Sequence, residues 1–211
     1  MDRNESRPVT TLALAAALVA WSGFAGPRLA PRWQAPVQAV LSAGLVGLTR
    51  APLGLRPPAL GRGLRLGLVV AGVVASGVAA TTAVPRVRGA MAGRDLPNPG
   101  YWLLVRIPIG TVWSEEAAFR AALGSAAGNA FGSRWGRLVQ SVAFGLSHVA
   151  DARRTGEPVL GTVLVTGAAG WAFGLLYERS GSLAASMLAH VAINEAGALA
   201  ALAVQRTSGT G

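Results

Sequence analysis

Long apolar runs dominate this chain and limit what it can fold into. Of its 211 residues, 52% are hydrophobic and only 13% are charged, and the mean hydropathy is +0.45. A soluble domain carries about 25% charged residues, so this depletion of charge along runs of Ala, Val, Leu and Gly indicates a membrane protein. The predicted fold class is all-α, a polytopic bundle of membrane helices.

Pro, Gly and Arg residues divide the apolar runs into separate helices. A bilayer core needs ~20 apolar residues per span, and the third, fourth, sixth and seventh runs meet this length, whereas the second and fifth are short. The expected helices cover residues 9–25, 36–49, 64–84, 100–126, 136–150, 159–177 and 182–204. We therefore predict about seven to eight transmembrane helices.

The first of these runs has two interpretations. It could be a signal peptide, but Asp2 and Glu5 dilute the positive charge that should precede such a segment, and further spans follow it. We expect a transmembrane helix at 9–25.

Two linkers rich in Pro, Gly and Arg interrupt the chain at 50–63 and 85–99. In the second, the Asn-Pro and Pro-Gly steps should end one helix and start the next. We predict a boundary at this linker. Residues 1–96 form N-terminal, lipid-facing transmembrane helices that could provide substrate entry, and 97–211 hold the unusual polar groups.

The net charge of +10 does not indicate a nucleic-acid protein. All 19 basic residues are arginines, placed singly or in pairs near the ends of the apolar runs, where they suit anionic lipid headgroups. A basic stripe with interleaved aromatic residues is missing from the sequence. The expected partners are membrane lipids, and no nucleic acid.

Two carboxylates and an arginine stand in the apolar run at 100–126. Glu116 and Arg120 are four residues apart and share a helix face, whereas Glu115 points about 140° away from Arg120. Glu116 can therefore pair with Arg120 while Glu115 faces elsewhere. These residues are either surface charges at the membrane interface or parts of a buried site.

The two histidines of the chain favour the buried site. Phe144 and His148 are four residues apart in one expected helix, and His190 and Asn194 in another. Polar groups inside a membrane usually face the bundle interior and mark a site. We expect these two helices and the one that carries Glu115 to converge on one point.

A carboxylate and two imidazoles can hold or activate a water molecule. A metal would lower the pKa of that water, and without a metal a buried Glu can act as a general base. Asn194 and a neutral His can donate hydrogen bonds to an oxyanion. Ser147 points about 100° away from His148 and is expected to be a poor partner for it. Because Cys is absent, His, Asp and Glu are the only strong metal ligands.

The segments 115-EEAAFR-120, 144-FGLSH-148 and 190-HVAIN-194 resemble the EExxxR, FxxxH and HxxxN motifs of the CPBP intramembrane metalloprotease family, the CAAX prenyl protease-like or Abi superfamily. The resemblance covers about 97–204. It implies that 97–211 form a catalytic helical core.

The same resemblance implies a role for each motif residue. Glu115 would activate the water, with His148 beside it, and His190 and Asn194 would complete the catalytic site, either as metal ligands or as oxyanion stabilisers. Glu116, Arg120 and Phe144 would support it structurally. A Zn²⁺ ion would be held by Glu115, His148 and His190.

The predicted function is that of an intramembrane metalloendopeptidase which hydrolyses a peptide bond of a peptide or membrane-protein substrate with a Glu/His-activated water, assisted by zinc. The alternative is a non-catalytic immunity or scaffold protein of the Abi type that binds a partner in the same cavity. A small transporter in which the intramembrane Glu and His carry protons is a third hypothesis. The expected location is the bacterial plasma membrane, as a multi-pass integral protein.

Overall fold

The computed structural model describes residues 6–208, so Asp2 and Glu5 lie outside the described part. Within this range the chain is helical and contains no strand. Its elements are α1 (Ser6–Ala20), η1 (Trp21–Ala25), η2 (Gly26–Arg28), α2 (Pro31–Thr49), α3 (Ala59–Thr82), α4 (Pro85–Ala92), α5 (Pro99–Tyr101), η3 (Trp102–Trp113), η4 (Glu116–Leu123), α6 (Gly124–Phe131), α7 (Ser133–Ser147), α8 (Val149–Thr155), α9 (Val159–Ser180) and α10 (Leu183–Ser208).

This architecture confirms the all-α prediction, and a helix occupies each of the seven expected positions. Two short helices, α4 and α8, were not expected. Four helices are long and apolar enough to cross a membrane: Arg7–Arg28, Ala59–Thr82, Val159–Ser180 and Leu183–Thr207. The count of seven to eight transmembrane helices stays a prediction.

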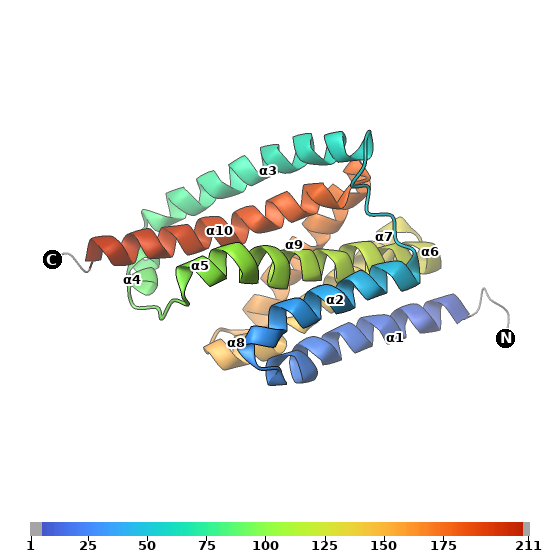
Figure 1. Cartoon of the computed structure of the whole chain (residues 1–211), viewed down its shortest axis with the longest axis horizontal. Coiled ribbons are helices and arrows are strands. Elements are labelled where there is room, and N and C mark those ends of the chain that lie inside the picture. Colours follow the sequence, from blue (N-terminus) through green and yellow to red (C-terminus); the bar gives the residue numbers. More distant parts are fainter. Residues whose placement is uncertain (1–5, 209–211) are drawn as a thin grey trace.

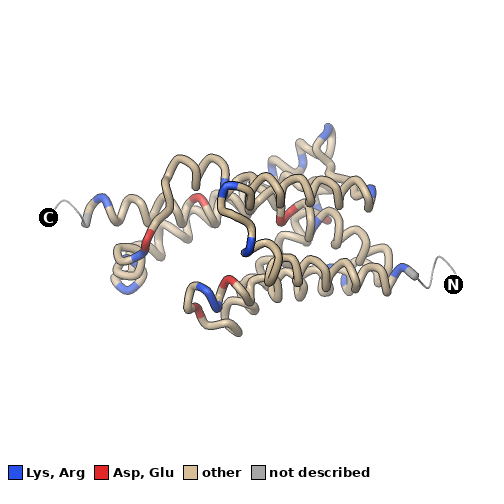
Figure 2. Tube along the Cα trace, turned by 60° about the horizontal axis from the view of Figure 1, so that its bottom comes forward, with Lys and Arg blue, Asp and Glu red and all other residues tan. Residues whose placement is uncertain are grey.

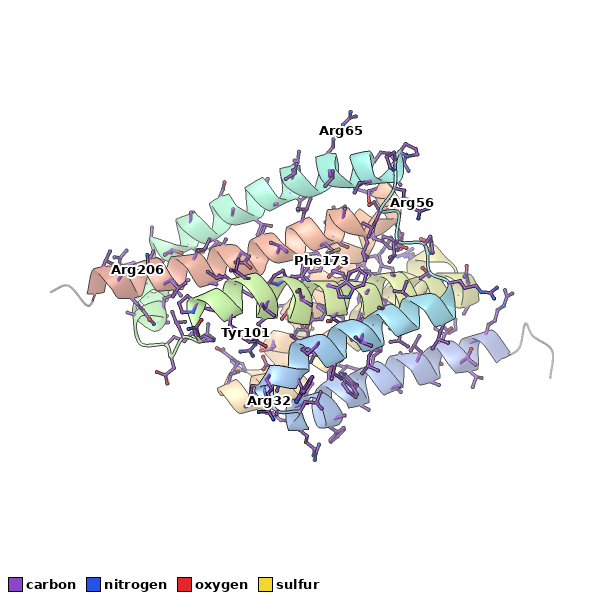
Figure 3. All side chains as sticks on the ribbon, viewed as in Figure 1. Arg32, Arg56, Arg65, Tyr101, Phe173 and Arg206 are labelled. Atoms are coloured by element: carbon purple, nitrogen blue, oxygen red, sulfur yellow. The ribbon has the colours of Figure 1, made fainter. Side chains whose placement is uncertain are left out.

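The long helices form a bundle in which the helical segment 99–131 is central (Figure 1). Its η3 part packs between α10 and α2, with α3 beyond α10, and α1 packs against α6 and α7. Figure 2 shows that the basic residues lie mostly near the ends of the helices. Arg56 and Arg65 project at the end of the bundle where α3 begins, and Arg206 lies near the far end of α10 (Figure 3). This distribution suits a protein whose helix ends meet lipid headgroups.

The central segment begins where the linker sequence predicts. Asn98 caps it by accepting a hydrogen bond from the backbone nitrogen of Tyr101 (3.2 Å), and Pro99 occupies the first turn, where its missing N–H costs nothing. Pro108 lies inside the segment, where it cannot donate to the preceding turn. Much of the segment is wound with i→i+5 hydrogen bonds, in η3 and η4, a geometry that occurs frequently at functional sites.

A hydrophobic cluster ties the first helix to the helices that carry the polar motifs. Ala15 and Leu18 of α1 pack with Phe119 and Phe144, whose rings meet edge to face at 5.2 Å between centroids. By contrast, α3 exposes most of its surface and packs mainly against α10. The N-terminal helices therefore differ in their exposure to lipid, and the predicted boundary at 96/97 stays a prediction.

Small residues let α3 approach α10 closely. A Cβ atom on Gly67 would lie 2.9 Å from Leu188 Cδ1 and 3.0 Å from Ala185 Cα, so the Leu188 side chain would have to move and the α10 backbone would have to give way by a few tenths of an ångström. Close backbone approach at small residues is a common way to join helices inside membranes. We therefore expect α3 to depend on this contact for its place in the bundle.

Gly67→Ala is expected to lower the free energy of unfolding by about 1–3 kcal/mol, the usual cost of overpacking. Denaturation of the detergent-solubilised protein measures it. Gly72→Ala is the matched control, because a Cβ at Gly72 has no neighbouring atom within 4 Å and alanine favours a helix. Equal losses in both variants would contradict the role given to this contact.

Candidate functional site

The ion pair predicted along the central helix is present and buried. Glu116 Oε2 lies 3.4 Å from Arg120 Nε, and both side chains are inaccessible to solvent. The interpretation of these two residues as surface charges at the membrane interface is therefore wrong. Burial strengthens their attraction, since the effective dielectric constant around them is low.

His190 lies between the two neighbouring carboxylates. Its Nδ1 is 2.8 Å from Glu116 Oε1, and its Nε2 is 3.8 Å from Glu115 Oε2. Because Glu116 also faces the Arg120 guanidinium, it is an ionised acceptor, and His190 Nδ1–H donates to it. A neutral imidazole then has its lone pair on Nε2, facing Glu115.

The two carboxylates differ in exposure as well as in partners. The Glu115 side chain is 28% exposed and the Glu116 side chain is fully buried. Glu115, the more accessible carboxylate, therefore faces Nε2 of His190, and the buried Glu116 orients the His190 ring. Carboxylates that fix an imidazole in this way are common in catalytic and metal sites.

Two phenylalanines complete the surroundings of His190 and Arg120. Phe173 of α9 stacks on the His190 ring, at 5.0 Å between centroids and 24° between planes. The Arg120 guanidinium carbon lies 3.8 Å from the Phe144 ring centroid and 5.0 Å from that of Phe173, within the range of cation–π attraction. Phe173 lies inside the bundle (Figure 3).

Sequence reasoning missed Phe173. Phe173 belongs to none of the three motifs, and a phenylalanine in an apolar helix does not by itself indicate a functional role. Phe144, predicted as a structural support, lies against Arg120 and meets both imidazole rings edge to face, at 4.7 Å for His148 and 6.3 Å for His190.

His148 follows the last residue of α7 and is half-buried. Its Nδ1 lies 2.8 Å from the Phe144 carbonyl oxygen and 3.2 Å from Ser147 Oγ. The expectation that Ser147 is a poor partner for His148 is wrong, because Ser147 Oγ lies within hydrogen-bond distance of His148 Nδ1 while it also donates to the Phe144 carbonyl oxygen at 2.7 Å. Donation from Nδ1–H to the carbonyl leaves Nε2 of His148 as an acceptor.

Asn194 uses its amide inside its own helix. Nδ2 donates to the His190 carbonyl oxygen one turn earlier, at 3.1 Å. An amide nitrogen carries two hydrogens, so the second N–H is left for another acceptor. The i,i+4 spacing of His190 and Asn194 therefore places both side chains on the same part of α10, as predicted.

The predicted zinc ligands are not assembled as a three-residue set. Residues 6–208 contain no group of three His, Asp or Glu side chains placed to hold one metal ion. Glu115 and His190 Nε2 face a common point, but His190 Nδ1 is engaged by Glu116, and His148 is bonded to its own helix. As placed, these residues do not fit the ~2.0–2.2 Å shell of a zinc ion. Zinc binding stays a prediction, which metal analysis of the purified protein tests.

Comparison with protein families supports the resemblance found in the sequence. Residues 97–196 match the family described as type II CAAX prenyl endopeptidase Rce1-like. This range contains every residue of the three motifs. Comparisons with curated proteins and with solved structures gave no match. With its four candidate spans, the chain is an integral membrane protein, and its residues 97–196 are similar to the CAAX protease-like family.

Proposed function

We propose that this protein is an intramembrane endopeptidase in which Glu115 activates the hydrolytic water. The observation that carries the proposal is the 3.8 Å separation between Glu115 Oε2 and His190 Nε2, with His190 Nδ1 engaged by Glu116. A water hydrogen-bonded to both atoms would face a proton acceptor on each side. The family match, to a group of proteases, favours a peptide bond as the substrate.

In the proposed step, Glu115 takes a proton from the water while the water oxygen bonds to the carbonyl carbon of the peptide. The C–N bond of the tetrahedral intermediate then breaks, and Glu115 returns the proton to the leaving amine. A positioned general base of this kind contributes about 10²–10⁴-fold to a rate. His190 holds the water through Nε2, while Glu116, Arg120 and Phe173 keep the ring in place.

His148 and Asn194 are proposed to contact the substrate. His148 Nε2 and the second N–H of Asn194 are not used by the bonds within their own helices, and the N–H is suited to the developing oxyanion. The proposed step does not depend on zinc, since the three predicted ligands do not form a zinc shell as placed. The bacterial plasma membrane stays the proposed location.

Hydrolysis in H₂¹⁸O tests the proposal directly. Protein reconstituted in liposomes is incubated with membrane-anchored peptides of varied sequence, and the products are analysed by mass spectrometry. An endopeptidase produces fragments whose new carboxyl terminus carries ¹⁸O from water. If no peptide in a broad set is cleaved, and membranes of cells that express the protein show no new termini, the proposal is wrong.

A further inference from the structure

A second feature of the molecule is a pocket that is lined in part by Arg120 of the Glu116–Arg120 pair. This pocket of about 450 Å³ opens at the end of the bundle where α9 finishes and α10 begins. Arg120, Arg137 and Gln140 are part of its lining, together with Tyr177 and Glu178 of α9. None of the three motifs predicts it, and only Arg120 belongs to both the pocket and the candidate active site.

The lining contains nitrogen donors without acceptors. Arg120 Nη1 and Nη2, Gln140 Nε2 and Arg137 Nε are buried atoms that have no hydrogen-bond partner within residues 6–208. Arg120 and Gln140 are each only 1% exposed. Buried polar atoms of this kind are rare in native structures and point to an unplaced water, ion or ligand.

The chemistry of these atoms selects the ligand. All four are N–H donors, and three belong to the guanidinium groups of Arg120 and Arg137, a type of group that binds carboxylate and phosphate oxygens in a bidentate manner. Glu178 already shows this preference, because it pairs with Arg137 Nη1 and accepts a hydrogen bond from Ser133 Oγ at 2.9 Å. Arg137 Nε and both Nη atoms of Arg120 have no hydrogen-bond partner in the described part of the chain.

The position of the pocket indicates where the ligand comes from. The candidate span Val159–Ser180 ends beside the pocket, and the candidate span Leu183–Thr207 begins there. Gly181 and Ser182 join the two spans. This connection therefore lies at one surface of the membrane, at the level of lipid phosphates and within reach of dissolved anions. Arg120 Nε faces Glu116 on the inner side, so one guanidinium joins the pocket to the carboxylate that orients His190.

From this arrangement we infer that the pocket is an oxyanion-binding site for a phosphate group. The group is supplied either by an anionic lipid headgroup or by a free phosphate, and it binds to Arg120, Arg137 and Gln140. Binding of this kind does not depend on proteolysis, so the inference stands or falls separately from the proposed function.

Inorganic phosphate is the first probe. The melting temperature of the purified protein in neutral detergent is measured by tryptophan fluorescence against phosphate concentration, with chloride at equal ionic strength as the reference. At a hundredfold excess over Kd, the melting temperature should rise by about 5 °C or more. Gln140→Met and Arg137→Gln should each weaken this binding at least about tenfold, as expected for the loss of one hydrogen bond to a charged group.

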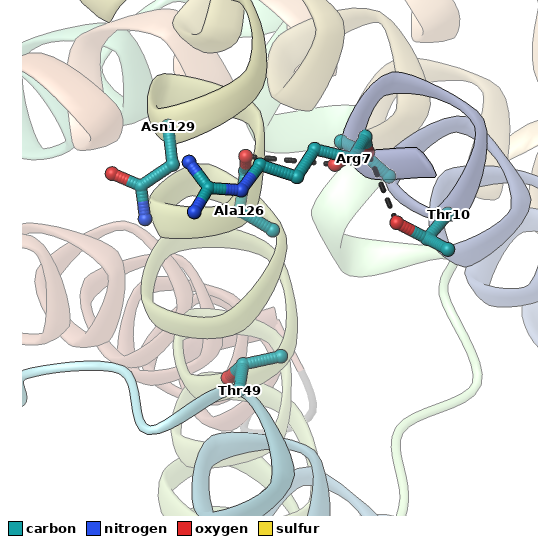
Figure 4. A pocket seen from close by; sticks show the side chains of 6 residues that line it. Arg7, Thr10, Thr49, Ala126 and Asn129 are labelled. Carbon is teal, nitrogen blue, oxygen red and sulfur yellow. Dashed lines mark hydrogen bonds between the residues drawn. The ribbon is translucent and has the colours of Figure 1, made fainter. Parts of the chain in front are cut away.

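A neighbouring pocket provides the matched control. It lies at the same end of the bundle and is lined by Arg7, Thr11, Thr49 and Asn129 among others (Figure 4). Arg7 is an exposed arginine, so Arg7→Gln removes one positive charge of the same surface without touching the buried donors. This variant should bind phosphate as the wild type does.

A second arm identifies the source of the phosphate group. The same four proteins are compared in nanodiscs of phosphatidylglycerol and of phosphatidylcholine. The site is supported if the protein responds to free phosphate or to phosphatidylglycerol alone, if both pocket variants weaken this response, and if Arg7→Gln preserves it. The probe that produces the response identifies the source of the phosphate group. The inference is overturned if neither probe stabilises the protein, if the pocket variants respond as the wild type does, or if Arg7→Gln abolishes the response.

Discussion

Replacing Glu115 with glutamine is expected to slow peptide hydrolysis by about 10²–10⁴-fold while the protein stays folded in the membrane. Glutamine has the size of glutamate but cannot take a proton from water. Glu115 is partly exposed, and its Oε2 has no hydrogen-bond partner within the described residues. The substitution therefore removes the proposed base without breaking a hydrogen bond within the described residues.

The rate of cleavage in liposomes and the melting temperature are measured together on Glu115→Gln. Glu195→Gln is the control, since Glu195 is a half-buried carboxylate of α10 next to Asn194 but outside the motifs. It should keep both the rate and the stability of the wild type. Cleavage by Glu115→Gln at the wild-type rate would show that Glu115 is not the base.

The same variant separates an enzyme from a non-catalytic relative. An immunity or scaffold protein that only binds a partner in this cavity needs the shape of the site, which glutamine preserves. If Glu115→Gln keeps the full effect of the protein in cells, the non-catalytic alternative is favoured over the endopeptidase. Ion flux through liposomes containing the protein would instead favour a transporter.

The parts of the site that follow from local spacing could be predicted from the sequence. Glu116 and Arg120 are four residues apart on one helix, so their pairing needs no knowledge of the rest of the fold. The helix start at Pro99 likewise depends on neighbouring residues alone. The apolar runs predicted the helices for the same reason, because length and composition decide whether a segment can lie in a membrane.

The contacts between helices could not be predicted in the same way. That His190 bonds to Glu116 rather than to Glu115 depends on how α10 is rotated against the central segment, and Phe173 reaches both His190 and Arg120 only because α9 packs beside them. Ser147 Oγ lies 3.2 Å from His148 Nδ1, a contact that the angular spacing of an ideal helix does not predict. The spacing of the motif residues did not predict the i→i+5 hydrogen bonds before and after Glu115 either.

Replacing Glu116 with glutamine is expected to cost about 3–5 kcal/mol of stability, because it leaves Arg120 as a buried charge without its partner. Unfolding in detergent measures the loss. Glu157→Gln is the control for an ion pair of the same composition, and since the side chains of Arg94 and Glu157 are 63% and 55% exposed, this change should cost under about 1 kcal/mol. If the two variants lose the same stability, the buried pair does not carry the expected energy.

A second substitution distinguishes the loss of stability in Glu116→Gln from a loss of catalytic activity. In the double variant Glu116→Gln/Arg120→Met, the unpaired charge is gone and Met fills the space between Phe144 and Phe173, so most of the stability should return. Hydrolysis should not return, because glutamine is a weaker acceptor than a carboxylate for His190 Nδ1–H and can hold the ring in the other tautomer, with Nε2 protonated towards Glu115. Recovery of both stability and cleavage in the double variant would mean that Glu116 serves only to neutralise Arg120.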